Sequence, residues 1–196
     1  MKPKCFIFDM DGTLFDTEYD WVRIKEELNT QGKPILSYLK SLKEPEKSLK
    51  WGILEKHEKK ATRNAVLKKG IMEYLNFLRE RAILQALVTN NSMENVEFLL
   101  SKFNLKFDFV ISRERGLWKP SGAPFWEVMK KLKVKRQECC VIGDSHFDIL
   151  AANEAGIKCI FILNEEKERF SSSNAEVFNS VEALRRRTID LLQARV

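Results

Sequence analysis

The chain has 196 residues, of which 44% are hydrophobic and 32% are charged, and this suffices for a sizeable core in either one large domain or one domain with a modest insert. No apolar run reaches the roughly 18 residues of a membrane-spanning helix, and the N-terminus lacks the pattern of a signal peptide, so we expect a cytoplasmic protein with no membrane partner. The formal net charge of +6 favours anionic partners. The sequence argues against nucleic acid as that partner, because it has no zinc-finger spacing, aromatic RNA-binding signature or recognition-helix pattern.

The first predicted strand is the apolar run Cys5-Phe6-Ile7-Phe8, and the acidic sequence Asp9-Met10-Asp11-Gly12-Thr13 follows it directly. Both acids are therefore expected in the turn at the carboxyl end of a strand, the edge where open parallel sheets bind ligands. One carboxylate can attack an electrophile while the other transfers a proton, and both can bind a hard cation such as Mg²⁺. On this motif alone, a turn that only reverses the chain is the alternative.

The next stretch, residues 16–68, is predicted to be a helical insert without a convincing strand. Apolar residues recur at helical spacing over 21–28 and 35–42, and a third helical segment covers 46–67. Prolines at Pro34 and Pro45 fall at the predicted breaks, because proline is tolerated in the first turn of a helix but not inside one. We expect two domains: a helical domain of residues 16–68 and an α/β domain of residues 1–15 and 69–196.

From Gly70 onward the pattern changes to alternating helices and apolar strands, which favours a doubly wound parallel sheet with helices on both faces. Strands are predicted over 83–88, 107–111, 139–142 and 158–163. Helices are predicted over 71–81, 93–103, 124–132, 147–155 and 181–194.

Polar motifs follow or separate these strands. Thr89-Asn90 comes after the second predicted strand, Trp118-Lys119-Pro120 places a lysine in a loop, and Gly143-Asp144-Ser145-His146-Phe147-Asp148 follows the strand over 139–142. Together with the first acidic motif, and in this order, they resemble the four signature motifs of the haloacid dehalogenase-like hydrolases, from about residue 4 to residue 162. The resemblance implies a Rossmann-like core, with the insert serving as a small cap domain over the site.

The resemblance also implies a phosphatase that hydrolyses a small, anionic phosphorylated metabolite through an aspartyl-phosphate intermediate. Asp9 would be the nucleophile and Asp11 the general acid and base. The implied cofactor is Mg²⁺, held by the carboxylates of Asp9 and Asp144 and the backbone carbonyl of Asp11. Asp148 would hold Lys119 or a metal-bound water, although on its own it could simply favour the start of a helix.

The predicted phosphate contacts are the hydroxyl of Thr89, the backbone N–H groups of Met10 and Asn90, and the ammonium of Lys119. Taken alone, Thr89 is more typical of a helix cap and Lys119 of a solvated loop. The substrate itself is not predicted, nor is the oligomeric state. The candidate substrate contacts in the insert are chosen only because they are cationic: Arg23, Lys25, Lys50 and Arg63.

Four other functions stay open. A phosphosugar mutase would use the same Asp9 and Asp11, whereas a metal-free dehalogenase would not need Asp11. A phospho-acceptor signalling module fits less well, because its phosphorylated aspartate usually comes later than the acidic pair and no insert follows it. A non-catalytic binding role is the remaining alternative.

The four cysteines lie in or beside predicted strands and show no metal-ligand spacing, so we expect buried reduced thiols, with a disulfide between neighbouring strand ends as the alternative: Cys5, Cys139, Cys140 and Cys159. Of the two histidines, His57 is expected at the surface. For His146 a structural or exposed role is favoured over contact with substrate.

Overall fold

The structure, a computed structural model, describes residues 2–194. The chain divides into two compact units: a larger α/β unit of Met1–Asp16 and Val66–Val196, and a smaller helical unit of Thr17–Ala65. None of the helices within the described residues combines the length and apolar character that crossing a bilayer requires.

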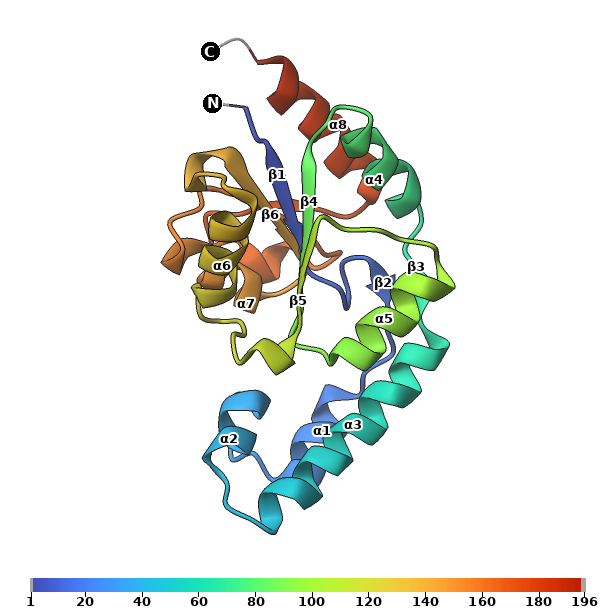
Figure 1. Ribbon diagram of the computed structural model, residues 1–196, viewed down its shortest axis with the longest axis vertical. Helices are drawn as coiled ribbons and strands as arrows, with labels where there is room; N and C mark the ends of the chain where they lie inside the picture. The colour runs from blue at the N-terminus through green and yellow to red at the C-terminus, as the bar shows by residue number, and fades with distance from the viewer. Residues whose placement is uncertain (1, 195–196) are drawn as a thin grey trace. The chain divides into compact units, whose positions relative to one another are not determined.

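The α/β unit is built on a six-stranded sheet in which every pair of neighbouring strands is parallel, in the order β5-β4-β1-β6-β7-β8 (Figure 1). The central strand β1 has no exposed residue, which is why its sequence is a continuous apolar run and does not alternate. The strands are β1 (Cys5–Phe8), β4 (Leu84–Val88), β5 (Phe109–Ile111), β6 (Cys139–Gly143), β7 (Cys159–Leu163) and β8 (Glu176–Phe178).

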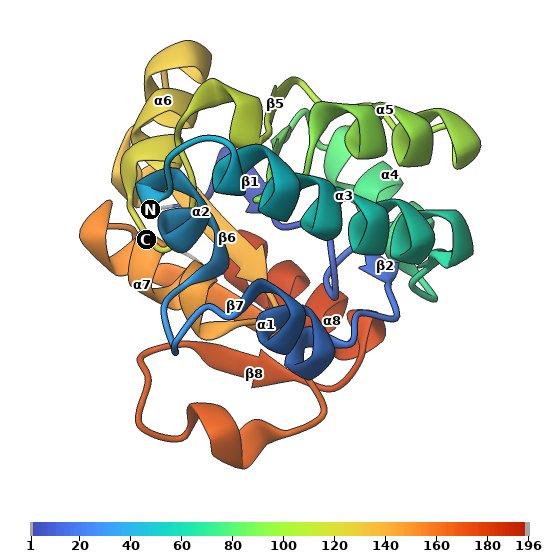
Figure 2. The same cartoon turned by 90° about the horizontal axis from the view of Figure 1, so that it is seen from below.

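Helices cover both faces of this sheet, with α6 and α7 on one face and α4 and α8 on the other (Figures 1 and 2). The predicted doubly wound α/β fold is therefore confirmed. The α-helices of this unit are α4 (Ile71–Arg79), α5 (Met93–Lys102), α6 (Ala123–Leu132), α7 (His146–Glu154) and α8 (Val181–Gln193), and the short 3₁₀ turns are η1 (Arg113–Arg115), η2 (Arg136–Glu138) and η3 (Lys167–Phe170).

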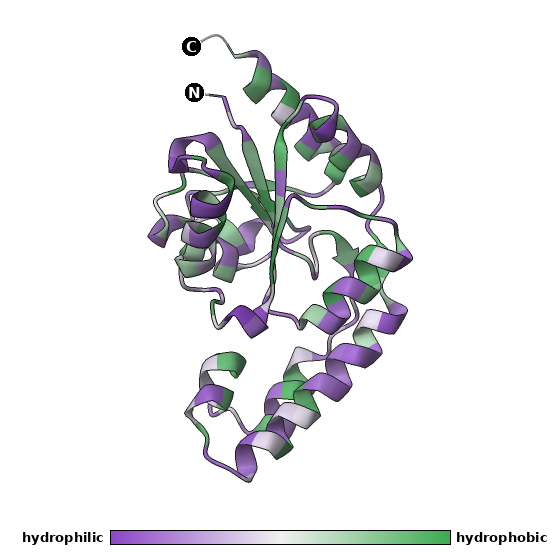
Figure 3. Ribbon diagram, in the orientation of Figure 1, coloured by the Kyte–Doolittle hydropathy of each residue, from purple (hydrophilic) through white to green (hydrophobic). Residues whose placement is uncertain are grey.

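The two faces of β1 supply two halves of the core. Cys5 and Ile7 belong to the apolar cluster under α6 and α7, which includes Phe125. Phe6 and Phe8 point to the opposite face, where their rings meet the edge of Tyr74 on α4. Figure 3 shows the result: the strands are mostly hydrophobic, apart from a hydrophilic band within β4, while the helices carry hydrophobic and hydrophilic stripes.

The helical unit contains α1 (Trp21–Leu28), α2 (Ile35–Ser41) and α3 (Glu46–Asn64). Lys50 on α3 ties the three helices together, because its ammonium donates to the carbonyl of Leu28 and to the hydroxyl of Tyr38, both at 2.6 Å. This lysine therefore supports the packing of the unit.

Short strands were missed by the sequence patterns. β2 (Phe15–Asp16) and β3 (Val66–Leu67) form an antiparallel ribbon where the chain leaves and re-enters the α/β unit, and Lys68 pairs with Asp16 beside it. The expectation of no strand between residues 16 and 68 is wrong, because strands of this length are too short to show an alternating pattern. The third predicted helix accordingly ends at Asn64, before β3.

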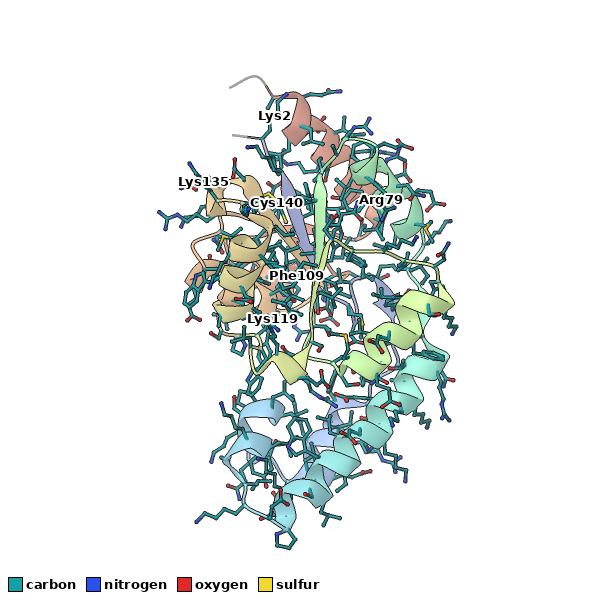
Figure 4. All side chains as sticks on the ribbon, viewed as in Figure 1. Lys2, Arg79, Phe109, Lys119, Lys135 and Cys140 are labelled. Carbon is teal, nitrogen blue, oxygen red and sulfur yellow. A yellow bond between two sulfur atoms is a disulfide. The ribbon has the colours of Figure 1, made fainter. Side chains whose placement is uncertain are left out.

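The cysteines divide into two pairs. Parallel pairing places Cys140 of β6 (labelled in Figure 4) opposite Cys159 of β7 with Cα atoms 4.6 Å apart, and these two form a disulfide. The expectation of reduced thiols is wrong for this pair, because the register that joins the cysteines could not be read from the sequence. Cys5 and Cys139 are free and buried, and their mutual hydrogen bond and burial raise the pKa of the Cys5 thiol, so it stays protonated.

Tyr74 provides a test of how α4 and α8 are joined. Its hydroxyl lies 2.9 Å from that of Thr188, which itself donates to the carbonyl of Leu184, so Tyr74 is the donor to Thr188. We expect Tyr74→Phe to lower the free energy of unfolding by about 1 kcal/mol, and Thr188→Val to lower it by about 1–3 kcal/mol because a buried hydroxyl is left without its partner. Urea denaturation measures both. A Thr188→Val protein as stable as the wild type would show that this bond does not stabilise the helix pair.

Candidate active site

The strand order creates a topological switch point at β1. From β1 the chain builds β4 and β5 on one side and later adds β6, β7 and β8 on the other. In open parallel sheets, the crevice for a ligand lies outside the carboxyl ends of the strands at such a point. Asp9, Thr89 and Asp144 are the residues that directly follow β1, β4 and β6, so the three predicted motifs meet at one edge of the sheet.

Lys119 is the centre of this edge. Its ammonium lies 2.6 Å from Oδ1 of Asp9 and 2.7 Å from Oδ1 of Asp148, and only 3% of its side chain is exposed. Burial opposes the charge of Lys119, but Asp148 and Asp9 more than compensate and raise its pKa, so the side chain remains an ammonium. Figure 4 shows Lys119 at the end of the sheet away from Lys2. The alternative of a solvated loop lysine is therefore excluded.

The loop that carries Lys119 is fixed to the end of β4. The side-chain amide of Asn90 donates to the carbonyl of Lys119 at 2.8 Å and accepts from the N–H of Lys119 at 2.9 Å. This pair of bonds joins residues 29 positions apart in the chain. Sequence reasoning assigned only the backbone N–H of Asn90 to the site and missed this role of its side chain.

Asp148 holds Lys119 and also accepts hydrogen bonds at the start of α7, two of the roles that the sequence left open. One carboxylate oxygen, Oδ1, binds Lys119, while Oδ2 accepts from the N–H of Ser145 at 3.1 Å and from its hydroxyl at 2.7 Å, at the start of α7. Gly143 makes this approach possible, because a Cβ there would lie 2.2 Å from the carboxyl carbon of Asp148.

Asp9, Asp144 and Asp148 form an acidic cluster in which one carboxylate oxygen from each residue lies within 4.8 Å of the other two. Burial raises the pKa of Asp9 well above its usual range, against the opposing effect of Lys119. Burial and the nearby charge of Asp148 raise the pKa of Asp144 to about 7. Gly12 lies against this cluster with a φ of +76°, and a Cβ there would lie 2.2 Å from Oδ2 of Asp144. The cluster holds more negative charge than Lys119 can neutralise, which suits it to a divalent cation.

Asp11 and Thr89 are connected through Asn91, a residue that the sequence reasoning did not select. The amide nitrogen of Asn91 donates to Oδ2 of Asp11 at 3.0 Å, and its backbone N–H donates to the hydroxyl of Thr89, also at 3.0 Å. Ser92 is the residue that caps α5, so Thr89 is not a helix cap. The only signal for Asn91 was its place two residues after Thr89. Met10, with a fully buried side chain, lies between the two acids.

Other candidates have partners within their own units. In the helical unit, Arg23 donates to Glu27 at 2.7 Å and His57 lies 2.8 Å from the same carboxylate. The side chain of His57 is 19% exposed and shares the Glu27 carboxylate with Arg23, so His57 is not simply a surface residue. His146 stacks on Phe170 in the α/β unit, with ring centroids 4.7 Å apart, which is a structural contact.

Comparison with known proteins identifies the family. The model of the haloacid dehalogenase-like hydrolases matches residues 23–162, which is most of the chain. The chain belongs to this family. It is an enzyme, and the resemblance seen in the four motifs is confirmed.

Two relatives and one solved structure match this hydrolase over most of their own length. The chain is 26% identical to the pyrophosphatase PpaX of Halalkalibacterium halodurans, with 81% of this chain and 82% of the relative covered. It is 27% identical to a phosphoglycolate phosphatase of Pseudomonas savastanoi pv. phaseolicola, with 81% and 68% covered. A solved structure of a hydrolase of the same superfamily from Ehrlichia chaffeensis superposes with a TM-score of 0.66 at 25% identity, covering 98% of this chain and all of that one.

The buried position of Lys119 in the hydrolase gives a prediction about stability. In the Lys119→Met protein, Asp9 and Asp148 stay buried without their counter-charge. Such a loss typically lowers the free energy of unfolding by about 3–5 kcal/mol. Lys158→Met is the matched control, since Lys158 is exposed and its loss should change the free energy of unfolding by less than about 0.5 kcal/mol. Denaturation in urea compares the two. Equal losses would show that the buried ion pairs do not stabilise the fold.

Proposed function

We propose that this hydrolase is a Mg²⁺-dependent phosphatase that cleaves the phosphomonoester of a small phosphorylated metabolite through an aspartyl-phosphate on Asp9. The observation that carries the proposal is the buried contact of Asp9 with Lys119 inside an acidic cluster. This contact directs the nucleophile and brings a positive charge to the point where a phosphoryl group would be transferred. A pyrophosphatase and a phosphoglycolate phosphatase among the relatives support a phosphorylated substrate.

The reaction has two steps at phosphorus. In the first, a carboxylate oxygen of Asp9 forms a bond to phosphorus while the bond from phosphorus to the ester oxygen breaks, and Asp11 gives its proton to that leaving oxygen. In the second, water attacks the aspartyl-phosphate, Asp11 takes the proton of the water, and the bond between phosphorus and Asp9 breaks. Free phosphate leaves, and both carboxyl groups return to their starting states.

The residues of the cluster fit a magnesium ion. Hard carboxylate oxygens from separate strand ends lie close together, and burial and the nearby charge of Asp148 raise the pKa of Asp144 to about 7. We assign the carboxylates of Asp9 and Asp144 and the backbone carbonyl of Asp11 as ligands. When bound, Mg²⁺ would neutralise the charge of the carboxylates and the phosphate. Asp148 is occupied with Lys119 and Ser145, which suits it to holding these groups in place.

The phosphoryl oxygens are bound by the hydroxyl of Thr89, the backbone N–H groups of Met10 and Asn90, and the ammonium of Lys119. Thr89 accepts a hydrogen bond from the N–H of Asn91, which leaves its own proton available for donation to the phosphate. The helical unit would act as the cap and select the rest of the substrate. A cytoplasmic location stays a prediction.

The nucleophile is tested by Asp9→Asn. A neutral amide cannot attack phosphorus, so we expect turnover of a generic aryl phosphate to fall below detection while the fold, followed by its melting temperature, persists. Asp16→Asn is the matched control, because Asp16 is exposed and lies in the same unit, and its activity should equal that of the wild type. A folded Asp9→Asn protein with most of its rate would contradict the assignment.

The metal site is tested by titrating Mg²⁺ against activity. Asp144→Asn should weaken the apparent affinity for Mg²⁺ far more than Asp148→Asn, because loss of a group that only supports the ligands typically costs about 10- to 100-fold. Melting temperatures identify any variant that fails to fold. Equal dependence on Mg²⁺ in the two variants, or full activity of the wild type in excess chelator, would contradict the proposed metal site. A metal-free reaction would then be favoured.

A further inference from the structure

We propose that Asn91 is a positioning residue for the reaction: it fixes the carboxyl group of Asp11 through a hydrogen bond to Oδ2 and leaves Oδ1 as the oxygen that transfers the proton. This inference rests on the proposed acid and base role of Asp11. It assigns a role to a residue for which the sequence motifs predicted none. Asn91 would act through Asp11 and would not itself exchange protons with the substrate.

A short chain of hydrogen-bonded amide groups lies at the beginning of α5. The side-chain nitrogen of Asn95 donates to Oδ1 of Asn91 at 2.8 Å, and the backbone N–H of Ser92 donates to the same oxygen, also at 2.8 Å. The nitrogen of Asn91 then donates to Oδ2 of Asp11 at 3.0 Å. Both asparagines are buried, at 3% and 4% exposure, so water competes little for these bonds.

This arrangement determines which way the amide of Asn91 faces. Both groups that point at its Oδ1 are N–H donors, so a flipped amide would set donor against donor on that side and acceptor against carboxylate on the other. The nitrogen must therefore face Asp11. The buried side chain of Asn91 therefore has one permitted orientation, in which its amide donates an N–H to the carboxyl group of Asp11.

The consequence concerns the two oxygens of Asp11. A hydrogen bond donated to Oδ2 holds this oxygen in place and restricts rotation of the carboxyl group. In the neutral acid the carbonyl oxygen is the better acceptor, so the proton resides on Oδ1. Asp11 is thereby oriented before the substrate binds, and efficient proton transfer requires such alignment with the reacting oxygen.

A purely structural role for Asn91 makes a different prediction, and two variants separate the roles. Asn91→Asp is nearly isosteric and keeps an acceptor for Ser92 and Asn95, but it has no N–H for Asp11. Asn91→Leu removes the donor without adding a charge. If Asn91 only held the start of α5, the Asn91→Asp protein would keep the activity of the wild type. If it positions Asp11, both variants lose activity and Asn91→Asp does so with a melting temperature near that of the wild type.

The assay is steady-state hydrolysis of 4-nitrophenyl phosphate and of a simple alkyl phosphate with Mg²⁺ at saturation. We expect kcat to fall by about 10- to 100-fold in both variants with KM little changed, which is the usual effect of misaligning a reacting group. The loss should be larger with the alkyl phosphate, whose poor leaving group depends more on protonation. Asn174→Asp is the matched control, because Asn174 is exposed and its amide exchanges hydrogen bonds with Asn153 near the C-terminal end of α7, away from Asn91 and Asp11 in sequence; its kcat should not change.

A double-mutant cycle with Asp11→Asn completes the test. On its own, Asp11→Asn should slow turnover by roughly 10²- to 10⁴-fold, and adding Asn91→Asp to it should then have little further effect. The positioning role would be overturned if either Asn91 variant kept the wild-type kcat. It would also be overturned if Asn91→Asp lowered kcat as much in the Asp11→Asn protein as in the wild type. Neither result would contradict the proposed role of Asp11. Full turnover in Asp11→Asn would instead overturn the proposed role of Asp11, so the two failures are distinguishable.

Discussion

A lysine ammonium buried between two carboxylates is the interaction on which the organisation of this sheet edge depends. Lys119 binds Asp9 at the end of β1 and Asp148 in the first turn of α7, after β6. Asn90, which follows β4, fixes the backbone of the same lysine. One buried charge therefore joins the ends of the three strands that form the switch point. Because such a charge is costly to bury without its partners, the buried position of Lys119 requires the carboxylates of Asp9 and Asp148.

The same interaction leaves the site with an excess of negative charge. One ammonium faces three carboxylates whose oxygens lie within 4.8 Å, and the pKa values of Asp9 and Asp144 are raised as a result of burial and mutual repulsion. A phosphate group would be repelled by this cluster unless a further cation were present, which is the physical reason for proposing Mg²⁺. The charge of Asp11 adds to that of the cluster and contributes to the raised pKa of Asp144, while Asn91 donates a hydrogen bond to the carboxyl group of Asp11.

Sequence patterns predicted the parts of the site that depend on strand ends. An apolar run followed by polar residues identified β1, β4 and β6, although Gln85 interrupts the run of β4, and parallel strands necessarily bring their carboxyl ends to one edge. The contacts of Asn90, Asn91 and Asn95 could not be predicted in this way. An amide side chain is donor and acceptor at once, so its role depends on which neighbours the tertiary structure supplies. The disulfide of Cys140 depended likewise on strand register.

The central claim, that Asp9 carries the phosphoryl group, is tested most directly by trapping the intermediate. The enzyme is mixed with an aryl phosphate and Mg²⁺, quenched with acid within a turnover and treated with a hydride reagent that reduces an acyl phosphate to the alcohol. Peptide mass spectrometry should then find homoserine at position 9 in the quenched sample and aspartate after a chase without substrate. Release of free phosphate without modification of Asp9 at any quench time, or modification of a different residue, would contradict the account.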